Sequence, residues 1–294
     1  MGCAPGVVVV TRDRRASLLH ALGRLVECSG AEEIVVVDNG SSDGSPRAVR
    51  RDFPQARVVE RATNAGAAAR NDGAAALDSE VIAFADDDSW WAPDALRRLA
   101  TAFAEPRLGL AAGRVLVGHE RRLDPTCEAM RVSPLGTSAL VGRPRVLGFV
   151  ACGAAVRRRA FLDAGGFHPL LQIGGEEELL ALDLAAGGWE LCYFDDIVAH
   201  HHPTHAHSRE GRAALKLRNR LWVSVLRRPW SRVASAALEL AARAPRDETA
   251  RRALGEAAVG LARVLPDRRR LPAPVERDIR RLEAKPLRAP PDSC

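Results

Sequence analysis

The N-terminal third of the chain alternates between short runs typical of strands and segments typical of helices. The runs are Val7–Val10, Ile34–Val37, Arg57–Val59 and Val81–Ala85, and the helical segments are Ala16–Val26, Ala65–Leu77 and Ala95–Ala104. Parallel neighbours in a sheet need a crossover, usually a helix, so this pattern predicts an α/β fold with a mainly parallel sheet flanked by helices. Ligands of such sheets bind beyond the carboxyl ends of the strands, where Thr11, Asp38 and Asp86 fall.

The rest of the chain is less regular and then becomes helical. We expect strands at Leu110–Val117, Val146–Arg157, Leu191–Phe194 and Ile197–Ala199, and helices at Glu176–Ala186, Glu210–Leu226, Val233–Arg243 and Glu248–Leu265. Residues 266–294 are rich in Pro and Arg, which predicts an extended or poorly ordered segment. The predicted organisation is an α/β domain at 1–207, a helical C-terminal extension at 208–268 and a tail at 269–294.

Composition narrows the cellular setting and the partners. The net charge of +6 fits several kinds of anionic partner, but no basic stretch is interleaved with aromatic residues, so we expect no nucleic acid. The six cysteines are scattered, which argues against a zinc knuckle or a disulfide framework and favours a reducing compartment. We find no signal peptide and no apolar run of about 18 residues. A cytoplasmic protein is expected, with peripheral contact at the inner face of the membrane left open.

Three consecutive carboxylates, Asp86, Asp87 and Asp88, follow the apolar run Val81–Ala85. Carboxylates packed at a strand end repel one another unless a cation or hydrogen-bond donors compensate their negative charge. An oxygen-rich cluster without thiolates suits Mg²⁺ or Mn²⁺, which commonly also bind substrate phosphates. The cluster therefore points to a nucleotide-using enzyme, and the alternative is a solvated acidic turn that caps the next helix.

Several ordered blocks together resemble the family 2 nucleotide-sugar glycosyltransferases of the GT-A (Rossmann-like) fold. The resemblance covers roughly residues 5–205. The blocks lie at 7–13, at 35–45, at Asn64 to Asn71, at Asp86–Asp88 with Pro93 and Asp94 behind it, at Gly165–Phe167, at Gly175–Leu179 and at Gly187–Trp189. A series in fixed order is far more specific than any single motif.

The resemblance assigns the donor side of a site. It implies that Thr11 and Arg12 line the base pocket, that Asp38 accepts a hydrogen bond from the base or a ribose hydroxyl, and that Arg70 lies beside the base or phosphates. Asp38 could instead cap a turn, and Arg70 could be an exposed helix residue in a surface ion pair.

The same resemblance implies a different role for each of the three acids. Asp86 lies near the ribose and the metal, Asp88 is the metal-binding acid of the Asp-x-Asp motif, and Asp87 touches the sugar or orients the loop. The implied cofactor is Mg²⁺ or Mn²⁺.

A Gly-Glu-Asp-like block at a helix start supplies the catalytic base in this family, and the matching position is Glu177. Glu176 and Glu178 flank it, so the base stays open among the three. Two further positions, often Asp and Arg in the family, are Leu179 and Asp183 here. The alternative is that these acids only stabilise the helix N-terminus.

Histidines and tryptophans add further candidates. We expect His202 first, and His200 second, to complete the metal shell or contact the diphosphate; a zinc or nickel site and a solvated loop are the alternatives. Arg209, Arg212, Arg218 and Arg220 could clamp phosphate, and Trp90, Trp91 and Trp189 either stack on a sugar or pack in the core.

The expected function is metal-assisted transfer of a hexosyl group, with inversion, from a UDP-, dTDP- or GDP-sugar. The acceptor is a hydroxyl of a glycan, lipid-linked or a small molecule. Two rivals remain: a nucleotidyltransferase on a related scaffold, and a degenerate sugar- or partner-binding module that has lost turnover. A homodimer is also left open.

Overall fold

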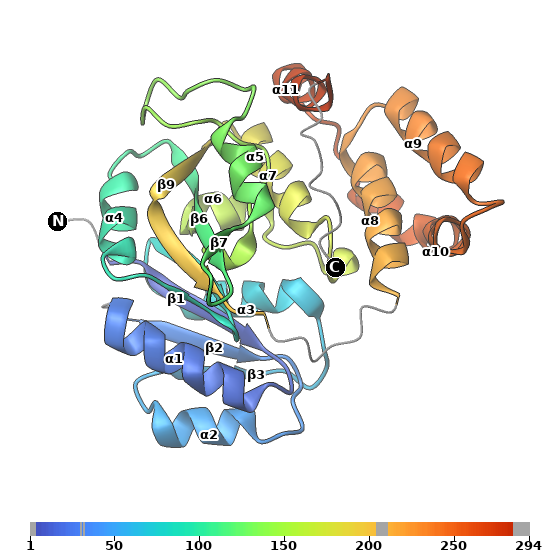
Figure 1. The fold of residues 1–294 in the computed structure, drawn as a ribbon. Helices are drawn as coiled ribbons and strands as arrows, with labels where there is room; N and C mark the ends of the chain where they lie inside the picture. Colours follow the sequence, from blue (N-terminus) through green and yellow to red (C-terminus); the bar gives the residue numbers. More distant parts are fainter. Residues whose placement is uncertain (1–3, 30, 32, 204–210, 285–294) are drawn as a thin grey trace.

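A computed structural model describes residues 4–29, 31, 33–203 and 211–284. One sheet forms the centre, with strand order β3-β2-β1-β4-β8-β6-β9-β5, and β7 pairs with β6 (Figure 1). The strands are β1 Gly6–Thr11, β2 Ile34–Asp38, β3 Arg57–Glu60, β4 Val81–Asp86, β5 Ser89–Trp91, β6 Leu108–Val117, β7 Arg122–Leu123, β8 Ala154–Arg157 and β9 Glu190–His201. The first four strands of the order run parallel, as the alternating pattern predicts.

The second half of the sheet is mixed. Strand β8 runs antiparallel to both β4 and β6, whereas β6 and β9 are parallel. The expected strand at Val146–Arg157 is wrong for its first part, because the regular strand begins only at Ala154. Strand β5 was not predicted: its three residues pair antiparallel with the end of β9, and Trp90 and Trp91 are buried there. Neither ring is free to stack on a sugar.

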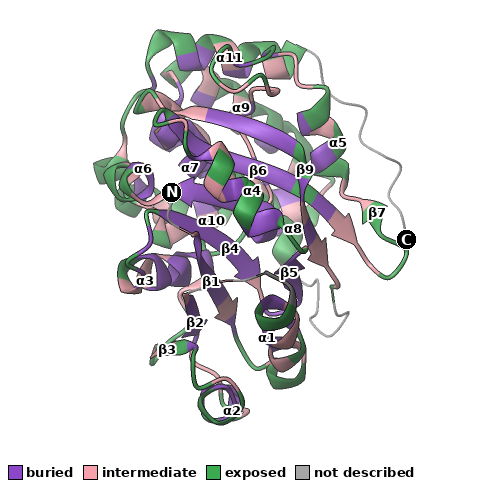
Figure 2. Cartoon of the chain, turned by 90° about the vertical axis from the view of Figure 1, so that its left-hand side faces the viewer, coloured by how far each residue is buried: buried purple, intermediate pink, exposed green. Residues whose placement is uncertain are grey.

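Helices cover both faces of the sheet. They are α1 Arg15–Ser29, α2 Ser45–Asp52, α3 Ala69–Ala76, α4 Ala95–Ala102, α5 Pro125–Arg131, α6 Arg158–Ala164 and α7 Glu176–Ala186. Figure 2 shows the strands as a buried layer between helices whose outer faces are exposed. One apolar cluster contains Val8, Phe84 and Phe167, and the opposite one contains Val7, Leu22 and Trp91. Alternate residues of β1 enter opposite clusters, which is the two-residue period of a strand.

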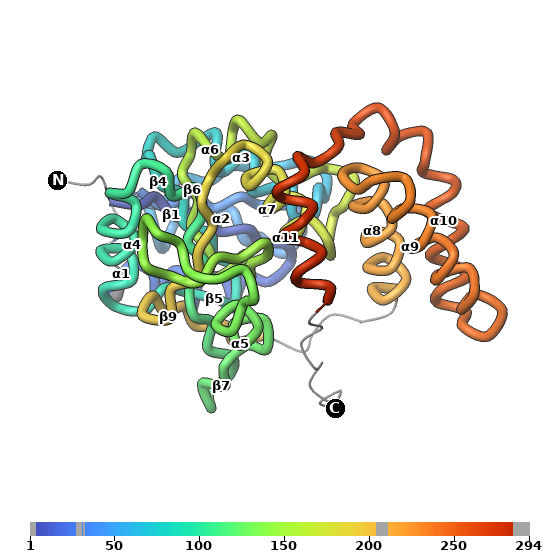
Figure 3. Tube along the Cα trace, turned by 90° about the horizontal axis from the view of Figure 1, so that it is seen from above, coloured from blue at the N-terminus to red at the C-terminus, as the bar shows by residue number. Residues whose placement is uncertain are grey.

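Four further helices lie to one side of the α/β part: α8 Arg212–Arg227, α9 Trp230–Arg243, α10 Glu248–Val264 and α11 Ala273–Ala284 (Figure 3). The expectation of an extended segment after residue 266 is wrong for 273–284, because α11 is a helix with Val275 and Ile279 in the core. The core of the extension includes Leu171, Leu179 and Leu182 from the α/β part. The extension is therefore packed onto α7.

Candidate active site

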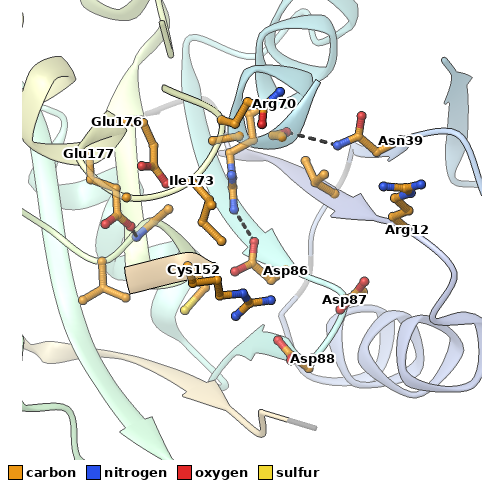
Figure 4. Close-up of a pocket in the computed structure, with 18 of the residues that line it drawn as sticks. Arg12, Asn39, Arg70, Asp86, Asp87, Asp88, Cys152, Ile173, Glu176 and Glu177 are labelled. Atoms are coloured by element: carbon orange, nitrogen blue, oxygen red, sulfur yellow. Dashed lines mark hydrogen bonds and ion pairs between the residues drawn. The ribbon is translucent and has the colours of Figure 1, made fainter. Parts of the chain in front are cut away.

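The predicted acidic cluster lies at the end of β4, on the wall of a pocket of about 1400 Å³ (Figure 4). Val10 of β1 pairs with Asp86 of β4, which brings the carboxyl ends of the two strands together. Asp87 and Asp88 are both buried, at 4% and 7% exposure. The alternative of a solvated acidic turn is therefore wrong.

Arg14 balances the negative charge of this cluster, a contact that no sequence pattern predicts. Its guanidinium lies 2.6 Å from Asp87 Oδ1 and 3.0 Å from Asp88 Oδ2. The Thr11 hydroxyl donates to Asp87 Oδ2 at 3.0 Å. Burial raises the pKa of Asp87 to about 7, against the pull of Arg14 and with repulsion from Asp88. Asp87 is thus held by protein groups, which fits the orienting role among its two expected roles.

Among the residues that the structure describes, the histidine facing the cluster is His201. Its Nε2 lies 3.4 Å from Asp88 Oδ1. Burial alone would raise the pKa of Asp88, but His201 and Arg14 hold it below its ordinary value. No group of three or more His, Cys, Asp or Glu side chains within the described ranges forms a ready metal centre. A carboxylate and an imidazole are nevertheless donor groups that suit a divalent ion.

His202, the first choice from the sequence, faces away from the cluster. Its ring centroid lies 4.7 Å from that of Trp90 and 4.6 Å from that of His119, and only its backbone N–H contacts the acid loop, donating to Asp88 O. His200 stacks on Trp90 as well. Successive side chains of a strand alternate between faces, so His201, and not the expected His202, is the histidine positioned to hold a metal together with Asp88.

Arg70 of α3 connects the two acidic sides of the pocket. It is buried, pairs with Asp86, and its guanidinium lies 5.4 Å from the centroid of the Phe167 ring. Burial opposes its charge, but Asp86, Glu177 and Glu176 raise the pKa of Arg70 above its ordinary value. Figure 4 shows it between the glutamates and Asp86. The alternative of an exposed surface pair is therefore wrong.

The carboxyl end of β2 supplies another wall. Asp38 is buried, and its Oδ2 accepts from Ser41 N–H at 2.9 Å, as a turn cap would. Its Oδ1 is buried and has no hydrogen-bond partner within the described part of the chain. The side chain of neighbouring Asn39 holds the 65–66 backbone against β2, and the half-exposed Arg12 lies at the pocket rim.

The glutamate block begins α7 across the pocket from these groups. Glu176 is buried, Glu177 is half-buried, and Glu178 is exposed. Glu177 Oε1 accepts from Ala151 N–H at 2.6 Å, and burial, together with Glu176, raises the pKa of Glu177 to about 7. Burial also raises the pKa of Glu176, whose Oε2 has no hydrogen-bond partner among the described residues. Both glutamates have chemistry suited to accepting a proton.

The block at Gly165–Phe167 is fixed by Asn71 of α3. Its Oδ1 accepts from Phe167 N–H at 2.9 Å, and its Nδ2 donates to Phe167 O at 2.8 Å. Gly166 has a φ of +67°, and a Cβ there would lie 2.5 Å from the Asn71 Oδ1. The contacts of Asn71 with Gly166 and Phe167 therefore hold α3, which carries Arg70, against the turn after α6.

A model of glycosyl transferase family 2 matches residues 6–165, more than half of the chain. The chain belongs to this family. It is 27% identical over 194 residues to the succinoglycan biosynthesis protein ExoU of Rhizobium meliloti (strain 1021), covering 62% of this chain and 57% of that protein. The chain thus spans little more than half the length of this curated relative.

Solved structures show the same fold. The mannosyltransferase PcManGT from Pyrobaculum calidifontis, in complex with GDP-Man and Mn²⁺, matches with a TM-score of 0.57 and 21% identity, over 97% of this chain and 88% of that one. S. aureus TarS 1-349 matches with a TM-score of 0.59 and 17% identity, over 81% and 65%. The predicted GT-A fold with a helical C-terminal region is confirmed.

Proposed function

We propose that this protein transfers a sugar, with inversion, from a nucleoside diphosphate sugar to an acceptor hydroxyl. The observation that carries the proposal is one pocket with Asp86–Asp88 on one wall and Glu176–Glu177 on the other, with Arg70 between them. Thr11, Arg12 and Asp38 are at the carboxyl ends of β1 and β2, where such sheets bind nucleotides. The free Oδ1 of Asp38 is an acceptor suited to a base N–H or a ribose hydroxyl.

In the proposed reaction Glu177 accepts the proton of the acceptor hydroxyl as its oxygen attacks the anomeric carbon. The bond from that carbon to the donor phosphate breaks, and the nucleoside diphosphate leaves with the electron pair. Asp88 and His201 would hold a Mg²⁺ or Mn²⁺ ion, which would offset negative charge on the leaving group. Arg70 lies between the glutamates and Asp86, and its positive charge partly neutralises the negative charge of the glutamates in the pocket.

The ligands present in structures of the fold neighbours support the choice of donor and metal. PcManGT was solved with GDP-Man and Mn²⁺, TarS 1-349 with UDP-GlcNAc, and GalNAc-T7 with UDP, GalNAc and Mn²⁺. We propose a UDP-, dTDP- or GDP-sugar, and a hexosyl group, for this chain. Family membership argues against the nucleotidyltransferase rival. The departures from the family pattern at Leu179 and Asp183 serve packing and ion pairing, so they give no support to the degenerate module.

A thermal-shift panel tests the proposal. UDP, dTDP, GDP and CDP are added with and without Mn²⁺ to wild type and to Asp88→Ala. A ligand at about 100 times its Kd stabilises the fold by about 2.7 kcal/mol. One nucleotide should raise the Tm only with Mn²⁺ and only in wild type. If no nucleotide shifts the Tm, the proposed donor site is refuted. Release of pyrophosphate instead of nucleoside diphosphate during turnover would establish the nucleotidyltransferase.

We also propose peripheral membrane contact through α9 and α10. No described helix is long and apolar enough to cross a membrane. These helices expose Trp230, Leu238 and Val259, at 58%, 70% and 88%. In the extension, basic side chains outnumber acidic ones roughly two to one. Wild type should pellet with vesicles of anionic phosphatidylglycerol but not with neutral phosphatidylcholine, and Leu238→Ser/Val259→Ser should reduce pelleting; equal recovery contradicts the contact.

A further inference from the structure

Three cationic side chains of α8 form a row along the edge of the active-site pocket. Arg212, Lys216 and Arg220 are four residues apart and all line the pocket. Residues at this spacing share one face of a helix. The row spans about 12 Å at the rise of an α-helix. It comes from the C-terminal extension, outside the stretch that matches the family model.

These three side chains are exposed and have no hydrogen bond or ion pair with other residues of the described chain. Their neighbours on the same helix differ: Arg218 pairs with Glu256, and Arg227 pairs with Asp183. Arg220 has only longer-range attraction to Glu178 and Glu283. Unpaired like charges held on one helix face repel one another, and a bound anion would relieve this repulsion.

The position of the row places it beside the glutamates. Asn219 is fully buried and donates to the carbonyl oxygens of Leu171, Ile173 and Gly174. A Cβ on Gly174 would lie 2.7 Å from Lys216 Cγ, so the Lys216 stem packs directly on the loop that leads into α7. The row is therefore fixed against the segment just before Glu176.

The groups proposed to bind the nucleotide lie elsewhere. Figure 4 shows Ile173, Glu176 and Glu177 on the side of the pocket away from Arg12 and Asn39. An acceptor hydroxyl has to reach the base, so the acceptor enters on the glutamate side. A row of three positive charges there fits an acceptor that carries a multiply charged anion close to its reacting sugar.

We propose that Arg212, Lys216 and Arg220 bind a phosphate ester of the acceptor, most favourably a diphosphate. The assignment rests on the proposed function, because it uses the glutamates to define the acceptor side. A diphosphate suits the row better than a single carboxylate, since it carries more charge and more acceptor oxygens to match three cations. The phosphate belongs either to a lipid carrier or to a soluble sugar phosphate.

Calorimetry on the full chain tests the row. Inorganic pyrophosphate and farnesyl diphosphate are titrated in EDTA, which keeps diphosphates out of a metal-assisted donor site. The test variant is Lys216→Gln/Arg220→Gln. The matched control is Arg246→Gln/Arg277→Gln, which removes the same charge from two exposed positions on the extension. The Kd of the nucleotide selected by the thermal-shift panel is measured with Mn²⁺ in all three proteins.

The test variant should weaken binding of both probes at least tenfold, whereas the control changes it less than twofold and nucleotide binding stays within twofold. Tighter binding of farnesyl diphosphate than of pyrophosphate assigns the phosphate to a lipid carrier, and equal binding assigns it to a soluble compound. Unchanged probe binding in the test variant overturns the proposal. So does an equal loss of nucleotide affinity, because the row would then clamp the donor. Failure of wild type to bind any nucleotide with Mn²⁺ refutes the proposed function separately.

Discussion

Asp183 of α7 and Arg227 at the end of α8 form a bidentate ion pair in which the guanidinium is buried. Arg227 is 1% exposed; its Nε and one terminal nitrogen donate to the two carboxylate oxygens, the latter at 2.8 Å. Its other terminal nitrogen donates to the carbonyl oxygens of Leu226 and Asp267. Asp183 stands where the family often has Arg, so its charge here serves to attach the extension. Leu179, the other departure, packs in the same interface.

Breaking this pair should destabilise the protein strongly. Arg227→Met leaves the Asp183 carboxylate without its guanidinium and should lower the free energy of unfolding by about 3–5 kcal/mol. Asp183→Leu/Arg227→Met, which removes both charges, should recover much of that loss. Urea denaturation of the single and double variants measures both. Equal loss in single and double variants would show that packing, not the unpaired charge, dominates.

The proposed base should show a large loss of turnover with little loss of binding. Glu177→Gln removes the proton acceptor while keeping shape, and should lower kcat by about 10²–10⁴-fold. Glu176→Gln is the comparison, since its unpaired Oε2 makes it the other candidate. Initial rates with saturating donor decide between them. Near-full transfer by Glu177→Gln would remove its assignment.

The raised pKa of Glu177 predicts a pH dependence. Its carboxylate is the active form, so kcat/KM should rise with pH and level off above about 7. A raised folded pKa means that the folded chain binds its proton more tightly than the unfolded chain does. Glu177 therefore costs stability as pH rises from its ordinary 4.5 to about 7, and Glu177→Gln should gain stability relative to wild type over that interval. A rate profile without this acid limb would contradict the assignment.

The two adjacent histidines should behave differently. His201→Ala removes the imidazole beside Asp88 and should raise the Mn²⁺ concentration needed for half-maximal nucleotide binding by about 10–100-fold. His202→Ala removes a ring packed on Trp90 and should leave that concentration within twofold while lowering the Tm. Mn²⁺ titrations, with binding of a fluorescent nucleotide as the readout, compare the two variants with wild type. The reverse pattern would restore His202 as the ligand.

Buried Asn219 should position the loop before α7. Asn219→Ala leaves three carbonyl oxygens without their donor. An unsatisfied buried polar group lowers the free energy of unfolding by about 1–3 kcal/mol. We expect a lower Tm and a raised acceptor KM, because the loop carries Gly174 beside Lys216, with nucleotide Kd unchanged. Equal changes in nucleotide and acceptor binding would indicate general unfolding instead.

Much of the donor side could be predicted because it follows from local patterns. The strands β1 and β2 are short β-branched runs and β4 is a short apolar run, and parallel pairing then requires Thr11, Asp38 and Asp86 to lie at one edge. Arg14 was missed, since a basic residue at a helix start gives no signal of which carboxylates it meets. Helix α11 was missed because Pro and Arg content outweighed its apolar spacing at Val275 and Ile279.

The sequence by itself determined which chemical groups follow one another along the chain. These are apolar runs, the acids that end them, and a glutamate block that begins a helix. Only the tertiary structure decided which histidine faces Asp88. The β6–β9 register shifts between Phe194 and Val198, so counting alternate residues from the first half of β9 does not give the face of His201. It likewise decided that Asp183 meets Arg227 and that the α8 row lies at the pocket. These contacts depend on how helices pack, and packing joins residues that no short-range period relates.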